Sequence, residues 1–170
     1  MDEHTPEGRL EALLERVAAG ETVALVTDAG TPGLSDPGAL LTDLAYERGL
    51  RVDAVPGPSA VANALALSGF FAQRFLFLGY LPRRAGAIKK ELAPYGDSPL
   101  TIVLFEAPSR VQKTLFAAHE ALGDRRAALC REMTKLHQEV VRGRLSELAG
   151  RDLVLKGEIT LVIEGLRRGD

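Results

Sequence analysis

The feature that most constrains the fold is a short apolar run that stops abruptly at a loop rich in glycine and proline. Residues 23–26 are all apolar, and the next twelve residues, 27–38, include three glycines and two prolines. Such a run suits a strand covered on both faces, and ligands in open α/β sheets bind just beyond the carboxyl ends of parallel strands. We therefore expect an α/β fold with a ligand site at this loop.

The composition of this loop indicates the kind of ligand. Its polar side chains are hydroxyls and carboxylates, namely Thr31, Ser35, Asp28 and Asp36. Neither the P-loop pattern nor the dinucleotide pattern of glycines occurs, and no lysine lies nearby. These features favour a polar small molecule, neutral or cationic, over a polyphosphate. The alternative is a plain turn in which Asp36 and Pro37 only cap the following helix.

A second unit repeats this arrangement. Residues 51–55 are predicted to form a strand, and the loop 56–59 leads into a helix from Ala60 to Ser68. Right-handed crossovers place the loops of consecutive parallel strands side by side, so the loops that carry Thr31 and Ser59 are expected to form two walls of one crevice. The alternative for Ser59 is a helix cap alone.

The rest of the chain alternates helical and strand patterns and divides into two lobes. Residues 1–80 are predicted as one α/β lobe with a mainly parallel sheet, and 81–170 as a second with a mixed sheet, because Gly79 and Pro82 interrupt the pattern around Tyr80. Apolar residues at helical spacing predict an opening helix that ends at Gly20. The other predicted elements are a strand at 22–26, helices at 38–48 and 59–68, a strand at 75–78, a strand at 100–105, a helix at 109–122, strands at 126–131 and 138–142, a helix at 144–149 and a strand at 159–164.

Charge is distributed unevenly along the chain. Residues 1–80 carry 5 Lys and Arg against 11 Asp and Glu, whereas residues 81–170 carry 16 against 12. A basic second lobe is expected where RNA phosphates bind, although a generally solvated surface gives the same count. The single Cys130 lies in an apolar stretch, the three histidines are scattered, and no apolar run is long enough for a membrane span. We expect no metal, no membrane and a cytoplasmic protein.

The second lobe contains another site-like position. The apolar strand pattern at 101–105 ends at Glu106, and Arg110 follows within the start of a helix. Side chains at the carboxyl end of a buried strand are suited to bind a ligand. The alternative is that Ser109 caps the helix while Glu106 and Arg110 form a surface ion pair.

Six sequence blocks in order resemble the ribosomal RNA methyltransferases of the tetrapyrrole methylase family. They are T-D-A-G-T-P-G-L-S-D-P-G, V-P-G-P-S-A, R-F-L-F-L-G-Y-L-P-R-R, F-E-A-P-S-R, R-E-M-T-K-L-H-Q-E and K-G-E-I-T-L-V-I-E-G. The resemblance runs from about Asp2 to Gly165. It implies a two-lobed fold, a homodimer, and methyl transfer from S-adenosylmethionine to the 2′-hydroxyl of a cytidine in small-subunit ribosomal RNA, with free RNA or the ribosomal subunit as partner. It also implies that family members begin with a further strand and loop ahead of Glu7 and continue beyond Gly165.

The resemblance assigns expected contacts residue by residue. The positions that match cofactor contacts are Gly30, Thr31, Leu34, Ser59, Ala60, Glu106, Ala107, Arg131, Ile159 and Thr160. A ribose hydroxyl must lose its proton during methylation, and the candidates for that role, in order of preference, are Glu106, Lys135 and Glu139, with Glu132 in the same segment. The expected RNA contacts are Arg83, Arg84, Lys89, Lys90 and Arg110, which would position phosphates.

Two other functions remain open on this evidence. A tetrapyrrole-type or other small-molecule methylase would keep the crevice but would not need the basic second lobe. A non-enzymatic module that binds RNA or forms dimers would bind RNA without binding the cofactor. Salt dependence of substrate binding and affinity for the cofactor distinguish these alternatives.

Overall fold

The structure, a computed structural model, describes residues 5–28, 30–35, 38–154 and 156–167. Within it the chain separates into two compact units, residues 1–59 and 60–170, which we call unit 1 and unit 2. Helix α3 (Ala60–Ser68) and strand β1 (Phe75–Tyr80) belong to unit 2 by this division. The predicted lobes, 1–80 and 81–170, stay a prediction.

The described part of unit 1 contains two helices, and extended segments follow each of them. Helix α1 (Glu7–Ala18) buries Leu10 and Leu14 on one face, and α2 (Ala39–Glu47) buries Ala45. An ion pair between Arg48 and Glu11 connects the end of α2 to α1. Both helices confirm the periodicity seen in the sequence. The predicted cap by Asp36 and Pro37 lies outside the described residues.

The strands predicted at 22–26 and 51–55 are not formed, so the parallel sheet expected in the first lobe is wrong for the described residues. Both segments are extended but belong to no ladder, and Val26 and Val55 are 81% and 90% exposed. A strand requires a hydrogen-bonded neighbour, and the described part of unit 1 offers no ladder to either segment. Apolar composition alone therefore overpredicted strand here.

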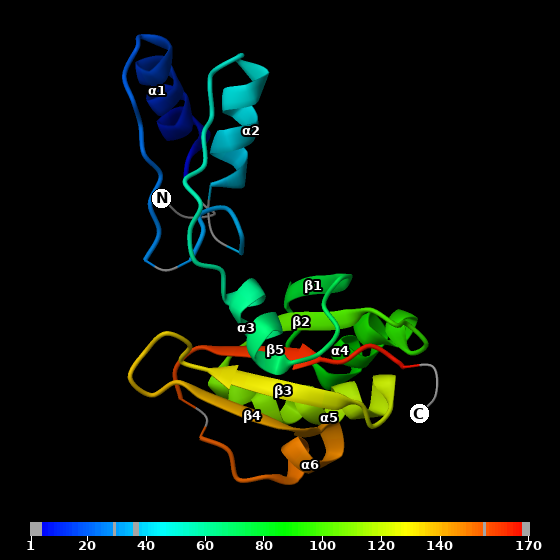
Figure 1. The fold of residues 1–170 in the computed structure, drawn as a ribbon. Coiled ribbons are helices and arrows are strands. Elements are labelled where there is room, and N and C mark those ends of the chain that lie inside the picture. Colours follow the sequence, from blue (N-terminus) through cyan, green and yellow to red (C-terminus); the bar gives the residue numbers. More distant parts are fainter. Residues whose placement is uncertain (1–4, 29, 36–37, 155, 168–170) are drawn as a thin grey trace. The chain divides into compact units, whose positions relative to one another are not determined.

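Unit 2 is built on one mixed sheet of five strands, in the order β1-β2-β5-β3-β4 (Figure 1). The strands are β1 (Phe75–Tyr80), β2 (Thr101–Glu106), β3 (Arg126–Arg131), β4 (Glu139–Arg144) and β5 (Ile159–Ile163). β1 and β2 are parallel, and every other neighbouring pair is antiparallel. The last strand in the sequence thus lies in the middle of the sheet, where all five of its residues are buried.

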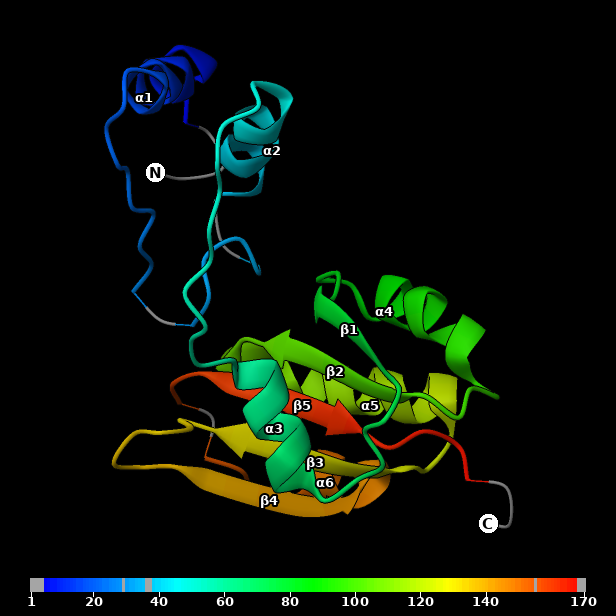
Figure 2. The ribbon, with the colours of Figure 1, turned by 45° about the horizontal axis from the view of Figure 1, so that its top comes forward.

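Helices cover both faces of this sheet. Helix α3 (Ala60–Ser68) crosses one face, while α5 (Val111–Leu122) and α6 (Leu145–Gly150) lie on the other (Figure 2). Because side chains alternate along a strand, Ile102 and Leu104 pack with α4 (Ala85–Leu92), α5 and α6, whereas Val103 packs under α3. Short 3₁₀ turns, η1 (Ala93–Tyr95) and η2 (Pro108–Arg110), follow α4 and β2.

Candidate functional site

In unit 1 the loop from Asp28 onward is shaped by residues in left-handed conformations. The φ values of Gly30 and Gly33 are 77° and 81°, a region that glycine enters without steric cost. Ser35 also has a positive φ, 56°, which is uncommon for a residue with a side chain. The amide of Leu34 donates to the carbonyl of Thr31 at 3.3 Å, which closes a turn at the tip of the loop.

A hydrogen bond connects this loop to the second Gly-Pro loop. The Thr31 hydroxyl donates to the carbonyl of Pro58, 3.2 Å away. The two loops that the sequence predicted to lie together therefore meet within unit 1. Ser59 and Ala60 follow directly, at the junction with α3, and both are partly buried.

An open hollow of about 530 Å³ lies beside the first loop. The loop and α2 line it with Pro32, Gly33, Leu34, Ala39, Thr42, Asp43 and Tyr46. Of the predicted cofactor contacts in unit 1, Leu34 lines this hollow and is 44% exposed. The mixture of apolar surface with a hydroxyl and a carboxylate suits a small polar molecule better than a polyanion.

In unit 2 the predicted site residues form a row along one edge of the sheet. Glu106 at the end of β2 pairs in register with Ile159 at the start of β5, and Ile159 pairs with Arg131 at the end of β3. Arg131 in turn pairs with Glu139, the first residue of β4. The order β2-β5-β3-β4 thus brings together residues from four strands and three separate sequence blocks.

Glu106 is buried, and both of its carboxylate oxygens have partners. Oε1 accepts a hydrogen bond from the Ala107 amide at 2.8 Å, and Oε2 accepts one from the Thr114 hydroxyl at 2.5 Å. The Arg110 Nε lies 3.0 Å from Oε1 as an ion pair. Glu106 has 2% of its surface exposed, and these contacts fix its side chain at the end of β2. The surface ion pair considered from the sequence is wrong, because this pair is buried.

Arg110 joins this carboxylate to the chain after β1. Its Nη2 donates to the carbonyls of Leu81 and Pro82, at 2.6 and 3.0 Å. Its side chain is 19% exposed. The guanidinium therefore fixes the segment that follows β1 against the end of β2, which differs from the solvent-facing role expected of a phosphate contact.

Arg131 and Glu139 form a more open pair at the same edge. The Arg131 Nε donates to Glu139 Oε2 at 3.2 Å. The arginine side chain is 11% exposed and that of Glu139 is 41% exposed. Of the three predicted proton acceptors, Glu139 combines a place in the row with an accessible carboxylate.

A clasp holds the segment after β3 against the turn before β5. The backbone amide of Glu132 donates to the Glu158 carbonyl at 2.9 Å, and Glu132 Oε1 accepts from the Glu158 amide at 2.8 Å. Lys135 Nζ lies 3.1 Å from Glu132 Oε1 and 3.0 Å from Glu158 Oε2. We call these three residues, with Gly157, the clasp.

The clasp shifts the pKa values of Glu132 and Lys135. The hydrogen bond from the Glu158 amide, followed by that from Lys135, lowers the pKa of Glu132. Hydrogen bonds to Glu158 and then Glu132 raise the pKa of Lys135. A lysine with a raised pKa stays protonated near neutral pH, so Lys135 is a poor proton acceptor. In the sequence, Gly157 and Glu158 stand directly before the last strand, and no local pattern connects them to Glu132.

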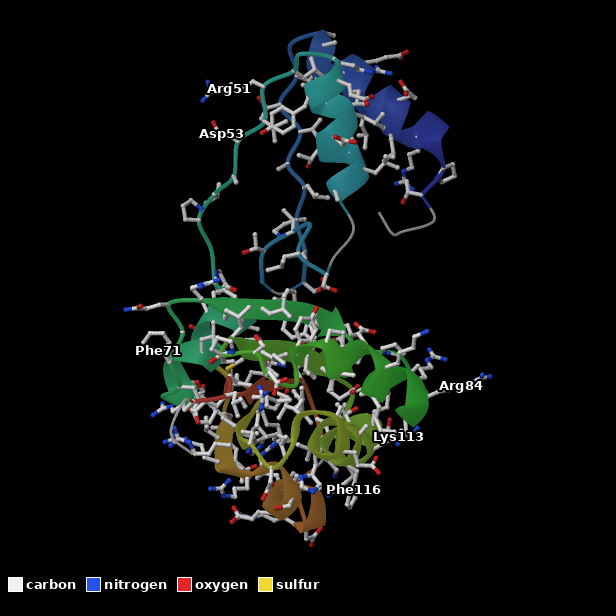
Figure 3. The ribbon with its side chains drawn as sticks, turned by 90° about the vertical axis from the view of Figure 1, so that its right-hand side faces the viewer. Arg51, Asp53, Phe71, Arg84, Lys113 and Phe116 are labelled. Carbon is white, nitrogen blue, oxygen red and sulfur yellow. The ribbon has the colours of Figure 1, made fainter. Side chains whose placement is uncertain are left out.

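Most of the predicted RNA contacts lie on or just before α4. Arg83, Arg84 and Lys90 are exposed, while Lys89 pairs with Glu120 at 3.2 Å. Lys113 on α5 donates to the Arg83 carbonyl at 3.3 Å and adds a cation that the sequence did not point out. Arg84 and Lys113 lie on the same side of unit 2 (Figure 3).

The described residues contain neither a metal-binding cluster nor a membrane-spanning helix. No group of three or more His, Cys, Asp or Glu side chains is placed to hold a metal ion within the described ranges. In the same ranges no helix is long and apolar enough to cross a membrane.

Comparisons with known proteins give a family match over most of the chain. The family model described as Tetrapyrrole (Corrin/Porphyrin) Methylases matches residues 3–149. A protein of Mycobacterium tuberculosis named ribosomal RNA small subunit methyltransferase I is 48% identical over 160 residues, which cover 92% of this chain and 56% of that protein. The chain thus spans about half the length of this relative.

A relative with the same name in Thermotoga maritima is 42% identical over 166 residues, 96% of this chain and 74% of its own length. Among solved structures, uroporphyrin-III C-methyl transferase from Thermus thermophilus complexed with S-adenyl homocysteine matches with a TM-score of 0.58 and 19% identity. That match covers 91% of this chain and 72% of the solved one. These likenesses confirm the predicted α/β fold.

Proposed function

The chain belongs to the tetrapyrrole methylase family, and on this premise we propose that it acts in S-adenosylmethionine-dependent methylation of small-subunit ribosomal RNA, at the 2′-hydroxyl of a cytidine. The observation that carries the proposal is the 42% identity, over 96% of the chain, to a Thermotoga maritima protein named ribosomal RNA small subunit methyltransferase I. The homodimer and the cytoplasmic location belong to the same proposal.

The residues present fit the proposed cofactor. In unit 1 the turn of Gly30, Thr31 and Leu34 offers backbone groups and a small hydroxyl beside an open hollow, and Ser59 and Ala60 follow the loop bonded to it. In unit 2 the proposed contacts are Glu106, Ala107, Arg131, Ile159 and Thr160, which belong to or adjoin the row at the sheet edge. S-adenosylmethionine, when bound, supplies an electrophilic methyl group.

The side chains in and near this row are proposed to have different roles. Glu139 is proposed to accept the proton that leaves the ribose hydroxyl, because its carboxylate, which pairs with Arg131, is still 41% exposed, whereas Glu106 is buried and Lys135 has a raised pKa. This reverses the order of preference reached from the sequence. Glu106 holds the turn after β2 in place, and Lys135 holds the loop after β3. Positioning of this kind contributes to rate by fixing the angle of approach.

RNA is proposed to contact the cations before and on α4. Arg83, Arg84 and Lys90 are exposed and follow one another closely, and Lys89 and Lys113 extend the same basic side. Arg110 is proposed to act indirectly, because it fixes Leu81 and Pro82, which directly precede Arg83. Contacts of this kind position the RNA backbone and do not read its sequence.

The first experiment is a calorimetric titration of the full chain with S-adenosylmethionine. Saturable binding is expected for the wild-type chain, and Thr31→Tyr should abolish it because a large ring cannot fit where the Thr31 side chain meets the Pro58 carbonyl. Thr31→Val is the matched control, because it removes only the hydrogen bond to Pro58 and should bind within a few-fold of wild type. An affinity that Thr31→Tyr leaves unchanged would refute the assignment of this loop.

The second experiment follows transfer of a radioactive methyl group to small ribosomal subunits. Glu139→Gln should reduce kcat by about 10²- to 10⁴-fold, the usual contribution of a general base, with cofactor affinity retained. Glu91→Gln, an exposed carboxylate on α4, is the control and should leave kcat unchanged. Methylation of a porphyrin precursor in place of RNA would support the small-molecule alternative. RNA binding without cofactor binding would support the non-enzymatic one.

A further inference from the structure

A second cluster of arginines lies at the other end of the β3-β4 ladder from the row described above. Arg126 pairs in register with Arg144, and Ala128 pairs with Arg142. Directly opposed residues, and residues two apart along a strand, share one face of a sheet. The three arginines therefore project from the same face of the two strands, which is the face that α3 covers with its apolar residues.

Phe70, two residues after the end of α3, organises this cluster. The guanidinium carbons of Arg142 and Arg126 lie 5.2 and 5.3 Å from the centre of the Phe70 ring, within the range of cation–π contacts. Gly69 precedes the ring with φ of 66°, and a Cβ there would lie 3.8 Å from the Arg142 guanidinium. The stack gives each planar guanidinium a defined orientation, as two-point binding of phosphate requires.

The acidic neighbours neutralise only part of the cluster. Arg126 is held by the buried Glu164, with two contacts of 2.6 Å. Arg144 donates to the Asp124 carbonyl at 2.8 Å, which carries no net charge. Among the ion pairs of the described residues none involves Arg142. Of the two guanidinium groups held on the Phe70 ring, that of Arg126 thus has a carboxylate partner and that of Arg142 is available to an external anion.

The surface between these side chains is concave. A hollow of about 280 Å³ is lined by Phe70, Arg126, Ala127, Arg142, Gly143, Arg144 and Glu147. The Glu147 carboxylate accepts the Arg144 backbone amide at 2.9 Å and is thereby held at the start of α6. Arg126 pairs with Glu164, and the Arg144 charge helps to lower the pKa of Asp124, so Arg142 is the arginine of this hollow without an ion pair among the described residues.

We propose that this arginine hollow binds a phosphodiester of the RNA strand, at a point separate from the methylation site. The inference rests on the proposed function, because RNA is the substrate named there. The ladder from Arg126 to Arg131 spans six residues, or about 17 Å at 3.3 Å per residue, so the hollow holds RNA at a distance from the reacting nucleotide. It contributes affinity and orientation rather than chemistry.

The test is binding of a fluorescein-labelled single-stranded RNA to the full chain, measured by anisotropy at several salt concentrations. Arg142→Ala is expected to raise the Kd about tenfold and to reduce the slope of log K against log salt by about one, as loss of one phosphate contact requires. Arg142→Lys should keep most of the slope but lose part of the affinity, since lysine keeps the charge without the planar fork.

The control is Arg151→Ala, which removes an equal charge from an exposed position after α6. It should change the Kd less than twofold. Circular dichroism melts of all variants check folding. In methyl transfer to ribosomal subunits, Arg142→Ala should raise KM and leave kcat at saturating subunit unchanged, which a structural defect would not do.

Each other outcome is decisive. The RNA-binding role of the hollow would be overturned if wild type, Arg142→Ala and the double variant with Arg144→Ala had equal Kd and equal slope. The proposed function would then remain intact. Equal losses in Arg142→Ala and Arg151→Ala would overturn it as a general charge effect. If Arg142→Ala loses binding to anionic vesicles while its RNA binding is unchanged, the hollow would be assigned to a lipid surface instead. A wild-type chain that neither binds nor methylates RNA would overturn the proposed function, and the inference with it.

Discussion

Gly157 is the residue whose missing side chain most directly permits the clasp. Its φ is 78°, and a Cβ there would lie 2.2 Å from Oε1 and 2.3 Å from Cδ of Glu132. Gly157→Ala should therefore strain the backbone and displace the Glu132 carboxylate, lowering the free energy of unfolding by about 1–3 kcal/mol. Urea denaturation of the full chain measures this loss.

Gly86→Ala is the matched control for that prediction. Gly86 lies within α4, has no neighbouring atom within 4 Å of an added Cβ and has no positive φ. Alanine is the better helix former, so this variant should be equal to wild type or more stable by up to about 1 kcal/mol. Equal stability of Gly157→Ala and wild type would contradict the clasp.

Glu164 predicts a pH dependence of stability. Burial alone would raise the pKa of this carboxyl, but the hydrogen bond from Arg126 and the charges of Arg126 and Arg167 outweigh burial and lower it. Because the folded pKa lies below the unfolded value of about 4.3, the stabilisation is complete above that value and is lost as the pH falls through the folded pKa.

Glu164→Gln should therefore be less stable than wild type at pH 7, and the difference should shrink below about pH 4. Urea midpoints at pH 7 and at acidic pH measure the loss of stability at neutral pH and its decrease in acid. Glu120→Gln removes a carboxylate that is 59% exposed and paired with Lys89, so its effect at neutral pH should be small. A deficit for Glu164→Gln that does not change with pH would mean that packing, and not charge, is responsible.

At the scale of elements, one buried hydroxyl connects α5 to the end of β2. Thr114 is fully buried on α5, and its hydroxyl donates to Glu106 Oε2 at 2.5 Å. Thr114→Val keeps the shape but leaves a buried carboxylate oxygen without this donor, which should cost about 1–3 kcal/mol of unfolding free energy. Thr114→Ser keeps the donor and should lose only about 1 kcal/mol for the deleted methyl group. A valine variant as stable as wild type would show that this bond is not needed.

The helices and strands of unit 2 were largely predictable because local pattern and packing agree there. The strand pattern at 126–131 corresponds to β3, and the helix pattern at 109–122 corresponds to η2 and α5. Helix α4 was not predicted, because Gly86 and the charged run at 89–91 obscure the helical spacing of its two buried residues, Ile88 and Leu92. The strands at 22–26 and 51–55 were overpredicted, since apolar composition does not reveal whether a ladder partner exists.

The candidate site was predictable as a set of residues but not as an arrangement. Sequence blocks indicated Glu106, Arg131, Glu139 and Ile159, yet their alignment depends on β5 entering between β2 and β3, a long-range pairing without a local signal. The burial of Glu106 follows from the same topology, because β5 and α5 enclose the end of β2. The ion pair between Lys135 and Glu158 was not predictable for a similar reason, since the two residues are distant in sequence.

At the scale of the whole molecule, the two units differ sharply in how much structure they bury. The complete sheet and both hydrophobic clusters belong to residues 60–170. In the described part of unit 1 the buried apolar side chains are Leu10, Leu14 and Ala45. Because folding must overcome a conformational entropy cost for each residue, a unit with few buried side chains is marginal, whereas unit 2 has a core of its own.

A fragment of residues 60–170 should therefore fold without unit 1. It is expected to show a cooperative thermal transition by circular dichroism, with slow amide exchange in β2, β3 and β5, the central strands. In the full chain, amides of β5 should exchange far more slowly than those of 22–26, which belong to no ladder. Fast exchange throughout the fragment, with a non-cooperative melt, would mean that unit 2 depends on residues 1–59 for its stability. Retained exchange protection together with lost S-adenosylmethionine binding is the expected result, because the Thr31 loop would be missing from an otherwise folded sheet.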